Sequence, residues 1–397
     1  MILKNSQSRS CFFRNILISL SALCITINSC TDKLPKEQKT KVDFTQAEMM
    51  LDFLSGLAKG ESVALKIESI LKAEGTELVI KQMNIMRKVT ANQYEQLLKG
   101  LIEKRMPDIV PVDSSERAKR GIQGLKYNVW VALSWAIEHI DILKERMAIL
   151  KELDVYLEAK NLATEFLPEP VELSPSLYIV MGGRAGAAAI DGNRIYIDLL
   201  IMTYSRVSKN RPLMNESEII EFFAHEMHHI GLSKYHKSKF GSLIMDENQR
   251  RIFGMLRSIV AEGSATYLIN SQRNIAFMRK YLKLSDETKK QDALLNKCED
   301  LISKLYEGKF KSQEDYEKEN TLMLGHGYHT VGSIMLSIID QVGGLESIMH
   351  VLADPRILLI EYNKAANVLA KKNDSAKMYI FNSKLSQEMT MLGIQSR

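Results

Sequence analysis

Apolar residues recur at helical spacing through the first half of the chain, over residues 44–166. The clearest stretches comprise Val63, Ile67, Ile70 and Leu71 and, after Ser115, Trp130, Leu133, Trp135, Ile137 and Ile140. Thr45 and Glu48 have the S/T-x-x-E spacing of a capping box, so we expect order to begin at Thr45. No residues in this half have metal-binding or catalytic spacing, and the pattern predicts a helical N-terminal region.

After residue 166 the pattern changes, and two stretches are rich in β-branched and aromatic residues. "LYIVMGG" (177–183) and "NRIYIDL" (193–199) therefore predict two strands. The glycine-rich piece between them does not match a phosphate-binding spacing and precedes a strand, so we interpret it as a mobile connection. Helical spacing returns from Ser217. We expect a mainly α protein of the α+β class, in which residues 167–397 hold a small sheet.

The N-terminus combines a basic start with an apolar run over residues 16–27 that ends near Cys30. Three basic residues precede the first acidic residue: Lys4, Arg9 and Arg14. The run is too short for a membrane span and has the length of a signal-peptide core. Its end, I-N-S-C, resembles a bacterial lipobox, which implies a lipoprotein signal peptide over residues 1–29 and a lipid on Cys30. The alternatives are an uncleaved anchor or a secretory signal cut elsewhere.

The stretch after Cys30 has almost no apolar content. Residues 30–43 include "TDKLPKEQKTKV", which predicts a solvated tether. Whether the N-terminus is a lipoprotein signal, an uncleaved anchor or a secretory signal cut elsewhere, the body of the protein is exported. With a lipid on Cys30, we expect an exported bacterial lipoprotein of the cell envelope that attaches to the membrane through its N-terminal anchor.

Composition and charge narrow the possible partners. The 397 residues are 45% hydrophobic and 25% charged, as in an ordinary globular protein. The formal net charge of +5 falls to +2 without the three opening basic residues, so charge gives no reason to expect nucleic acid as a partner. Cys11 and Cys24 would leave with the signal and Cys30 would be acylated. Cys298 then remains alone and cannot form an internal disulfide.

The stretch "EFFAHEMHHIGL" (221–232) is the strongest chemical signal in the chain. On a helix, His225 and His229 lie four residues apart on one face, close enough for both imidazoles to bind one metal ion. Glu226 lies at the side of that face, where it can act as a general base without binding the metal. His228 points away, which favours a structural role. Asn215, with Glu218 three residues later, can cap the start of the predicted helix, and Gly231 can end it.

A third ligand distinguishes a metal site from a histidine-rich core helix. A metzincin would place glycine and histidine where this chain has Leu232 and Tyr235, so we reject that class and keep His236 as an outside candidate. Glu262 in "SIVAEGSATYLIN" is the better candidate, because it follows an aliphatic helical run. Its small neighbours, Gly263 and Ala265, would let two helices approach closely.

These motifs resemble those of the gluzincin metallopeptidases, in which a glutamate on the next long helix completes the site. The resemblance implies that His225, His229 and Glu262 bind zinc, that one position stays open for water, and that Glu226 is the base. Thr266 is a departure, because some gluzincins have an aspartate there that orients a ligand histidine. The partner that orients the ligands is therefore not identified.

A later cluster, "GHGYHTVGSIM" (325–335), contains His326, Tyr328 and His329. Gluzincins often supply a tyrosine or histidine from a later helix to stabilise the oxyanion, a role that needs an O–H or N–H donor. Tyr328 is our first candidate for this role and His329 our second. Alternatively, Tyr328 only packs against the helix, and the glycines of the cluster allow a close helix crossing.

The whole combination resembles a group of bacterial lipoproteins of unknown function described as zinc-dependent peptidases. This resemblance implies a membrane-anchored enzyme that uses Zn²⁺ to hydrolyse a peptide or protein substrate. If strand 193–199 is the edge of the sheet, it could align an extended peptide by backbone pairing. The alternatives are a lipoprotein binding module with a structural or degenerate zinc site, and a helical scaffold in which the motif is accidental.

Overall fold

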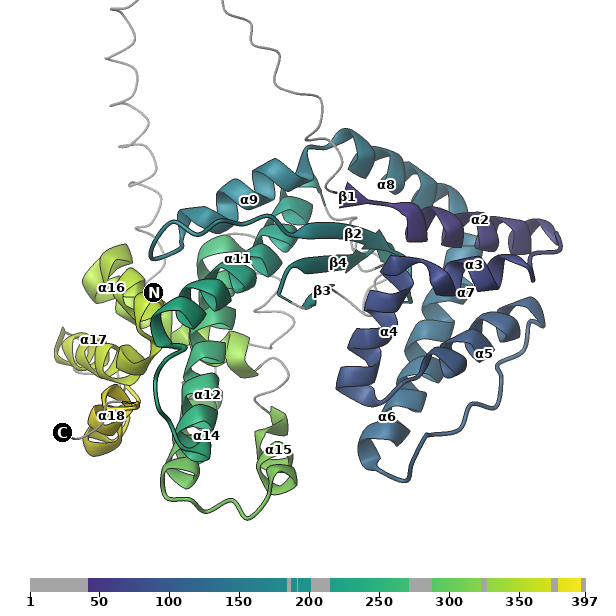
Figure 1. Cartoon of the computed structure of the whole chain (residues 1–397). Coiled ribbons are helices and arrows are strands. Elements are labelled where there is room, and N and C mark those ends of the chain that lie inside the picture. Colours follow the sequence, from purple (N-terminus) through teal and green to yellow (C-terminus); the bar gives the residue numbers. More distant parts are fainter. Residues whose placement is uncertain are drawn as a thin grey trace, which may run out of the picture. The chain divides into compact units, whose positions relative to one another are not determined.

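Helices make up most of the described part of the chain, and a small four-stranded sheet lies among them (Figure 1). The structure, a computed structural model, describes residues 42–183, 187–190, 192–200, 215–270, 288–322, 327–372 and 378–393. All of them belong to one unit, Lys41–Arg397. The predicted signal peptide, Cys30, most of the predicted tether and His326 lie outside the described residues. The elements confirm the predicted mainly α, α+β fold.

Helices fill the N-terminal part of this unit, as the apolar pattern predicts. They are α2 (Thr45–Lys59), α3 (Lys66–Lys72), α4 (Glu74–Arg87), α5 (Ala91–Ile102), α6 (Glu116–Gly124), the π-helical η2 (Leu125–Val129), α7 (Trp130–Glu138), α8 (Ile140–Glu152) and α9 (Val155–Glu165). α2 begins at Thr45, but the predicted capping box there is wrong. The N-cap position is Phe44, and the Thr45 N–H donates to Asp43 Oδ1 at 2.7 Å.

The sheet has the strand order β1-β2-β4-β3. The two predicted strands are confirmed as β2 (Ser176–Val180) and β4 (Arg194–Asp198), which pair in parallel. β1 (Val42–Asp43) pairs in parallel with β2 and comes from the end of the predicted tether. β3 (Ala187–Ile190) pairs antiparallel with β4, so part of the predicted mobile connection is a strand. Its three alanines have low strand propensity, and pairing with β4 makes the strand.

β4 lies inside the sheet, between β2 and β3, so the prediction that it forms the edge is wrong. The edge on this side is β3. One face of the sheet packs on α4, where Tyr196 joins a small apolar cluster with Leu78 and Val79. Ile195 and Ile197 belong to the main core, and α11 (Glu216–Phe240) contacts both β3 and β4.

α11 is the central helix of the second half, and it packs on α9 (Figure 1). The predicted cap at its start is confirmed: Asn215 Oδ1 accepts from the Glu218 N–H, and the Glu218 carboxylate accepts from the Asn215 N–H. The predicted end at Gly231 is wrong, because the helix continues to Phe240. Gly231 instead allows close packing, since an added Cβ would lie 2.6 Å from Leu167 Cδ1.

α12 (Glu247–Ser264) continues into a π-helical turn, η3 (Ala265–Ile269), and packs against α16 (Tyr328–Ala353). The two helices cross at Gly263 and Gly332, where an added Cβ on Gly332 would lie 2.1 Å from the Ile259 carbonyl oxygen. The expectation that Gly263 lets two helices approach closely is therefore confirmed.

α16 is long and apolar enough to cross a membrane by length and composition. In this fold, however, its buried side chains join the main core against α12. The C-terminal part also contains the other described helices. They are α14 (Thr288–Tyr306), α15 (Gln313–Leu322), the short η5 (Pro355–Ile357), α17 (Leu358–Lys372) and α18 (Ser383–Thr390).

Candidate metal centre

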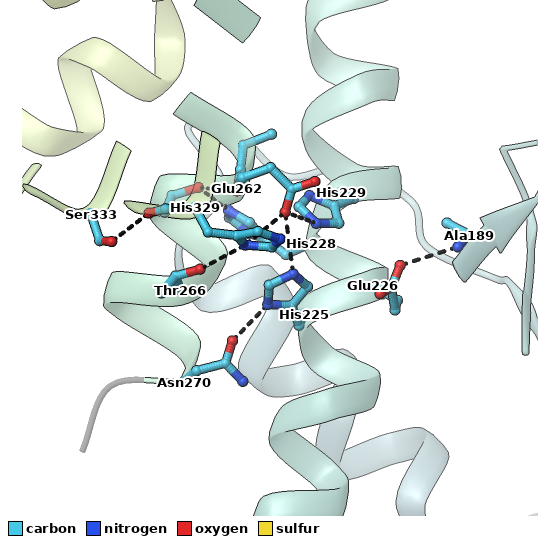
Figure 2. Close-up of polar contacts among 12 residues, drawn as sticks. Ala189, His225, Glu226, His228, His229, Glu262, Thr266, Asn270, His329 and Ser333 are labelled. Carbon is cyan, nitrogen blue, oxygen red and sulfur yellow. Dashed lines mark hydrogen bonds and ion pairs between the residues drawn. The ribbon is translucent and has the colours of Figure 1, made fainter. Parts of the chain in front are cut away.

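The histidine motif occupies the middle of α11. Phe223, Met227 and Ile230 share one face of the helix and are buried in the main core. This packing fixes the rotation of the helix about its own axis. His225 and His229 consequently point away from the sheet and toward α12, as Figure 2 shows.

Glu262 on α12 completes a cluster of three candidate ligands. Glu262 Oε2 lies 3.5 Å from His225 Nε2 and 3.1 Å from His229 Nε2. The three ligand atoms all lie within 4.8 Å of one another. Donor atoms of a tetrahedral zinc site, with bonds of roughly 2.0–2.1 Å, are about 3.3 Å apart. The spacing therefore fits one small cation held by two imidazoles and a carboxylate.

The surroundings of Glu262 also fit a cation. Its Oε2 atom is buried and has no hydrogen bond of good geometry, although several imidazole nitrogens surround it. Burial alone would raise the pKa of Glu262, but His229, His225 and His329 together hold it well below its usual range. Burial disfavours the charged form of His229 too, yet Glu262 outweighs burial and raises the pKa of His229 to about 9. A carboxylate that keeps its charge here can stabilise a metal ion in the same position.

Two polar residues that follow Glu262 on the same helix contact the site. Asn270 Oδ1 lies 2.6 Å from His225 Nδ1, and Thr266 Oγ1 lies 3.1 Å from His329 Nδ1. The sequence analysis noted Thr266 only as a departure from the gluzincin pattern and missed Asn270. A signal was present, because Glu262, Thr266 and Asn270 follow one another at steps of four residues.

The other two histidines of α11 lie outside the cluster and bind the protein itself. His228 Nδ1 is 3.2 Å from the Ala163 carbonyl oxygen, and its Nε2 is 2.9 Å from Ser264 Oγ. His236 Nε2 donates to the Leu352 carbonyl oxygen at 2.7 Å. Burial lowers the pKa of His228 to about 3 and that of His236 to about 4. The structure thus does not bring His236, the outside candidate, to the metal cluster.

Glu226 lies on the flank of α11 that faces the sheet (Figure 2). Its Oε2 atom accepts from the Ala189 N–H of β3 at 3.1 Å. Along an antiparallel pair of strands, the N–H and C=O groups of alternate residues point toward the partner strand and away from it. The Ala189 N–H is directed to α11, so Ala189 is one of the residues whose backbone groups point away from β4 and outward from the sheet edge. The candidate base and the edge strand are therefore direct neighbours.

The structure brings His329, the second candidate for the oxyanion, into the site and places Tyr328 elsewhere. His329 Nδ1 lies 3.1 Å from Glu262 Oε2. The Tyr328 hydroxyl is buried and donates to Asn320 Oδ1 at 3.1 Å, and Asn320 Nδ2 donates to the Tyr316 hydroxyl at 3.0 Å. Neighbouring residues on a helix differ by about 100° in direction, so the rotation of α16 selects His329.

This arrangement defines a candidate centre of two histidines and a glutamate, with a second carboxylate beside it. The chain belongs to the family described as "Putative zinc dependent peptidase (DUF5700)", whose model matches residues 67–371. The family description indicates zinc as the metal and a hydrolase as the class of enzyme. Among curated proteins and among solved structures, nothing matches the chain.

Proposed function

We propose that the protein is a gluzincin-type zinc peptidase in which His225, His229 and Glu262 hold the metal and Glu226 is the general base. The observation that carries this proposal is the buried Glu262 Oε2, which has no good hydrogen bond and lies 3.1 to 3.5 Å from the Nε2 atoms of both motif histidines. The family description supports the same metal and the same class of enzyme.

The residues divide the chemistry of peptide hydrolysis among them. When bound, zinc would lower the pKa of a water to about 7 and polarise the scissile carbonyl. Glu226 takes a proton from the water as the water oxygen bonds to the carbonyl carbon. It then gives this proton to the amine as the carbon–nitrogen bond breaks. His329 is the candidate donor to the oxyanion, because the structure places it beside Glu262.

The sheet edge supports a binding mode for an extended peptide. β3 contacts α11, and the outward N–H of Ala189 reaches Glu226. A substrate strand paired with β3 would take over this N–H from Glu226 and place its own backbone next to the base. Ala189→Pro removes this outward N–H without removing a bond to β4, and proline is tolerated at such edge positions. We expect a rise in KM for peptides from this change, and an unchanged KM would remove β3 from the proposal.

The zinc content of the purified full chain tests the centre itself. We expect about one zinc per chain in the wild type and loss of the metal in His225→Ala and Glu262→Ala, because each change removes one of three ligands. If only the histidine variant loses zinc, the third ligand lies elsewhere. If the wild type binds no zinc after metal supplementation, the motif is a core helix and the proposed function is wrong.

Peptide hydrolysis by Glu226→Gln tests the catalytic step. We expect a loss of about 10²–10⁴-fold in kcat, while zinc stays bound, because an amide cannot accept the proton. Glu221→Gln, which lies on the same helix, is the matched control and should keep full activity. A wild type that binds zinc but cleaves no peptide would favour the alternative, a binding module with a structural zinc site.

We also propose that a lipid on Cys30 attaches the protein to a membrane of the cell envelope. The basic start, the apolar run and the cysteine at its end support this proposal. Fatty-acid labelling of the wild type and of Cys30→Ala tests it. Label in the wild type alone would support the anchor, and label in neither protein would contradict it.

A further inference from the structure

We propose that Asn270 is the positioning residue that fixes His225 as a metal ligand, and that the π-helical turn η3 brings it there. This inference rests on the proposed metal centre, because it concerns the orientation of one of its ligands. It names a residue that neither the H-E-x-x-H motif nor the glutamate of the next helix includes.

The contact between Asn270 and His225 is short and buried. Asn270 Oδ1 lies 2.6 Å from His225 Nδ1, and Asn270 is 4% exposed. An amide oxygen can only accept, so the proton of a neutral His225 must be on Nδ1. The lone pair on Nε2 is then directed toward Glu262 and is available for a metal ion. A flipped amide would donate to Nδ1 and place the proton on Nε2, which would prevent metal binding.

The position of Asn270 depends on the π-helical turn. Asn270 follows Glu262 by eight residues. In a regular α-helix, with about 100° per residue, its side chain would point about 80° away from that of Glu262 around the helix axis. Residues Ala265–Ile269 form the wider π turn, and the Asn270 N–H closes it on the Ala265 carbonyl oxygen at 3.1 Å. A π turn holds more residues than an α turn, so Asn270 comes back to the side that carries Glu262. The polar stripe 262, 266 and 270 is thereby kept facing α11 and α16.

Thr266 and Asn270, the two later residues of the stripe, contact different histidines. Thr266 contacts His329, whereas Asn270 contacts His225. Asn270 orients the ligand without adding a negative charge, unlike a carboxylate partner. An aspartate of the same shape would keep the acceptor and add charge, so Asn270→Asp is the conservative replacement. Alanine would remove the acceptor and leave the imidazole free to turn.

The experiment measures the zinc affinity of the purified full chain by competition with a chelating indicator. We expect Asn270→Ala to weaken zinc binding by about 10–100-fold, as loss of a partner of a ligand histidine typically does. Asn270→Asp should bind zinc at least as tightly as the wild type. Asn367→Ala, the same substitution at an exposed position of α17, is the matched control and should stay close to the wild type.

Thermal unfolding of the metal-free variants separates positioning from a merely structural role. We expect metal-free Asn270→Asp and Asn367→Ala to unfold near the wild-type temperature. Wild-type zinc affinity in Asn270→Ala would overturn the inference. So would an equal loss of affinity in the alanine and aspartate variants, because the acceptor would then not matter. If the wild type binds no zinc, the proposed function fails first. If it binds zinc without cleaving peptides, the role of Asn270 is still measured.

Discussion

The four histidines of α11 form two pairs with opposite properties, His225 with His229 and His228 with His236. The first pair faces the Glu262 carboxylate, and the pKa of His229 is raised to about 9. The second pair faces mainly backbone carbonyls and is more deeply buried than the first, and this burial lowers the pKa values of His228 and His236 to about 3 and about 4. Burial and the charge of the partner therefore decide together which pair is suited to hold a cation and which stays neutral.

Removing the charge of Glu262 should reduce the difference between the two pairs. Glu262→Gln keeps the size of the side chain but places a neutral amide beside the two imidazoles of the first pair. We expect loss of stoichiometric zinc and of peptidase activity, measured by metal analysis and peptide cleavage. Glu247→Gln, at the exposed start of the same helix, is the control and should retain both. One zinc per chain in Glu262→Gln would show that the proposed metal centre does not need this charge.

The glycine crossing offers a second way to change the surroundings of the first pair. In Gly332→Ala the new Cβ would lie 2.1 Å from the Ile259 carbonyl oxygen, so α16 must move away from α12. We expect the free energy of unfolding to fall by about 3 kcal/mol, the upper end for overpacking, and His329 to leave Glu262. Urea unfolding and zinc content measure the two effects.

Gly254→Ala is the matched control for the crossing, because an added Cβ on this α12 glycine meets nothing within 4 Å. It should stabilise the protein by about 0.5–1 kcal/mol, since alanine favours a helix over glycine. Equal effects of the two substitutions would mean that the crossing does not set the position of His329.

The second pair should affect the dependence of stability on pH. His236 has a pKa of about 4 when folded and an ordinary value near 6.5 when unfolded, so the unfolded chain takes up a proton first as the pH falls. Stability is therefore complete above pH 6.5 and is lost as the pH decreases toward 4. Between pH 7 and 5, His236 should lower the free energy of unfolding by about 2 kcal/mol.

Urea unfolding of the metal-free wild type and of His236→Asn at both pH values measures this contribution. The variant should lose about 2 kcal/mol less than the wild type over that interval, because asparagine does not titrate. An equal loss in both proteins would show that His236 is not kept neutral by the fold.

The smallest effect is expected at Ser264, which contacts His228 of the second pair. A neutral His228 that donates from Nδ1 to Ala163 has only a lone pair on Nε2, and the Ala261 carbonyl oxygen, 3.1 Å from Ser264 Oγ, is a second acceptor for the same hydroxyl proton. Ser264→Ala should lower the free energy of unfolding by about 1 kcal/mol and leave zinc content unchanged. Loss of zinc in this variant would mean that the two pairs are coupled.

The sequence predicted those parts of the site that depend on spacing within one helix. The positions of His225, His229 and Glu226 follow from the helical repeat, and the cap at Asn215 follows from local hydrogen bonding. Glu262 was predictable because it follows a long apolar helical run. These signals are local, so they do not require knowledge of how the helices pack.

The remaining parts depend on long-range contacts. Three alanines predict no strand, and β3 exists because β4 pairs with it. The choice of His329 over Tyr328 depends on the rotation of α16, which the glycine crossing sets in this fold. The steps of four residues from Glu262 to Asn270 were visible in the sequence, but the π turn that brings Asn270 to His225 was not. Residues 42–43 looked like tether because a two-residue strand has no pattern of its own.

The contact between Glu226 and β3 has a consequence for how the protein behaves at high concentration. An edge strand exposes backbone groups that can pair with another chain, and charged groups nearby protect such edges from self-association. Glu226 both occupies the Ala189 N–H and places a negative charge beside it. Replacing this glutamate by glutamine removes that charge. Preparations of the Glu226→Gln protein should therefore be checked for oligomers by light scattering before a bound partner is inferred.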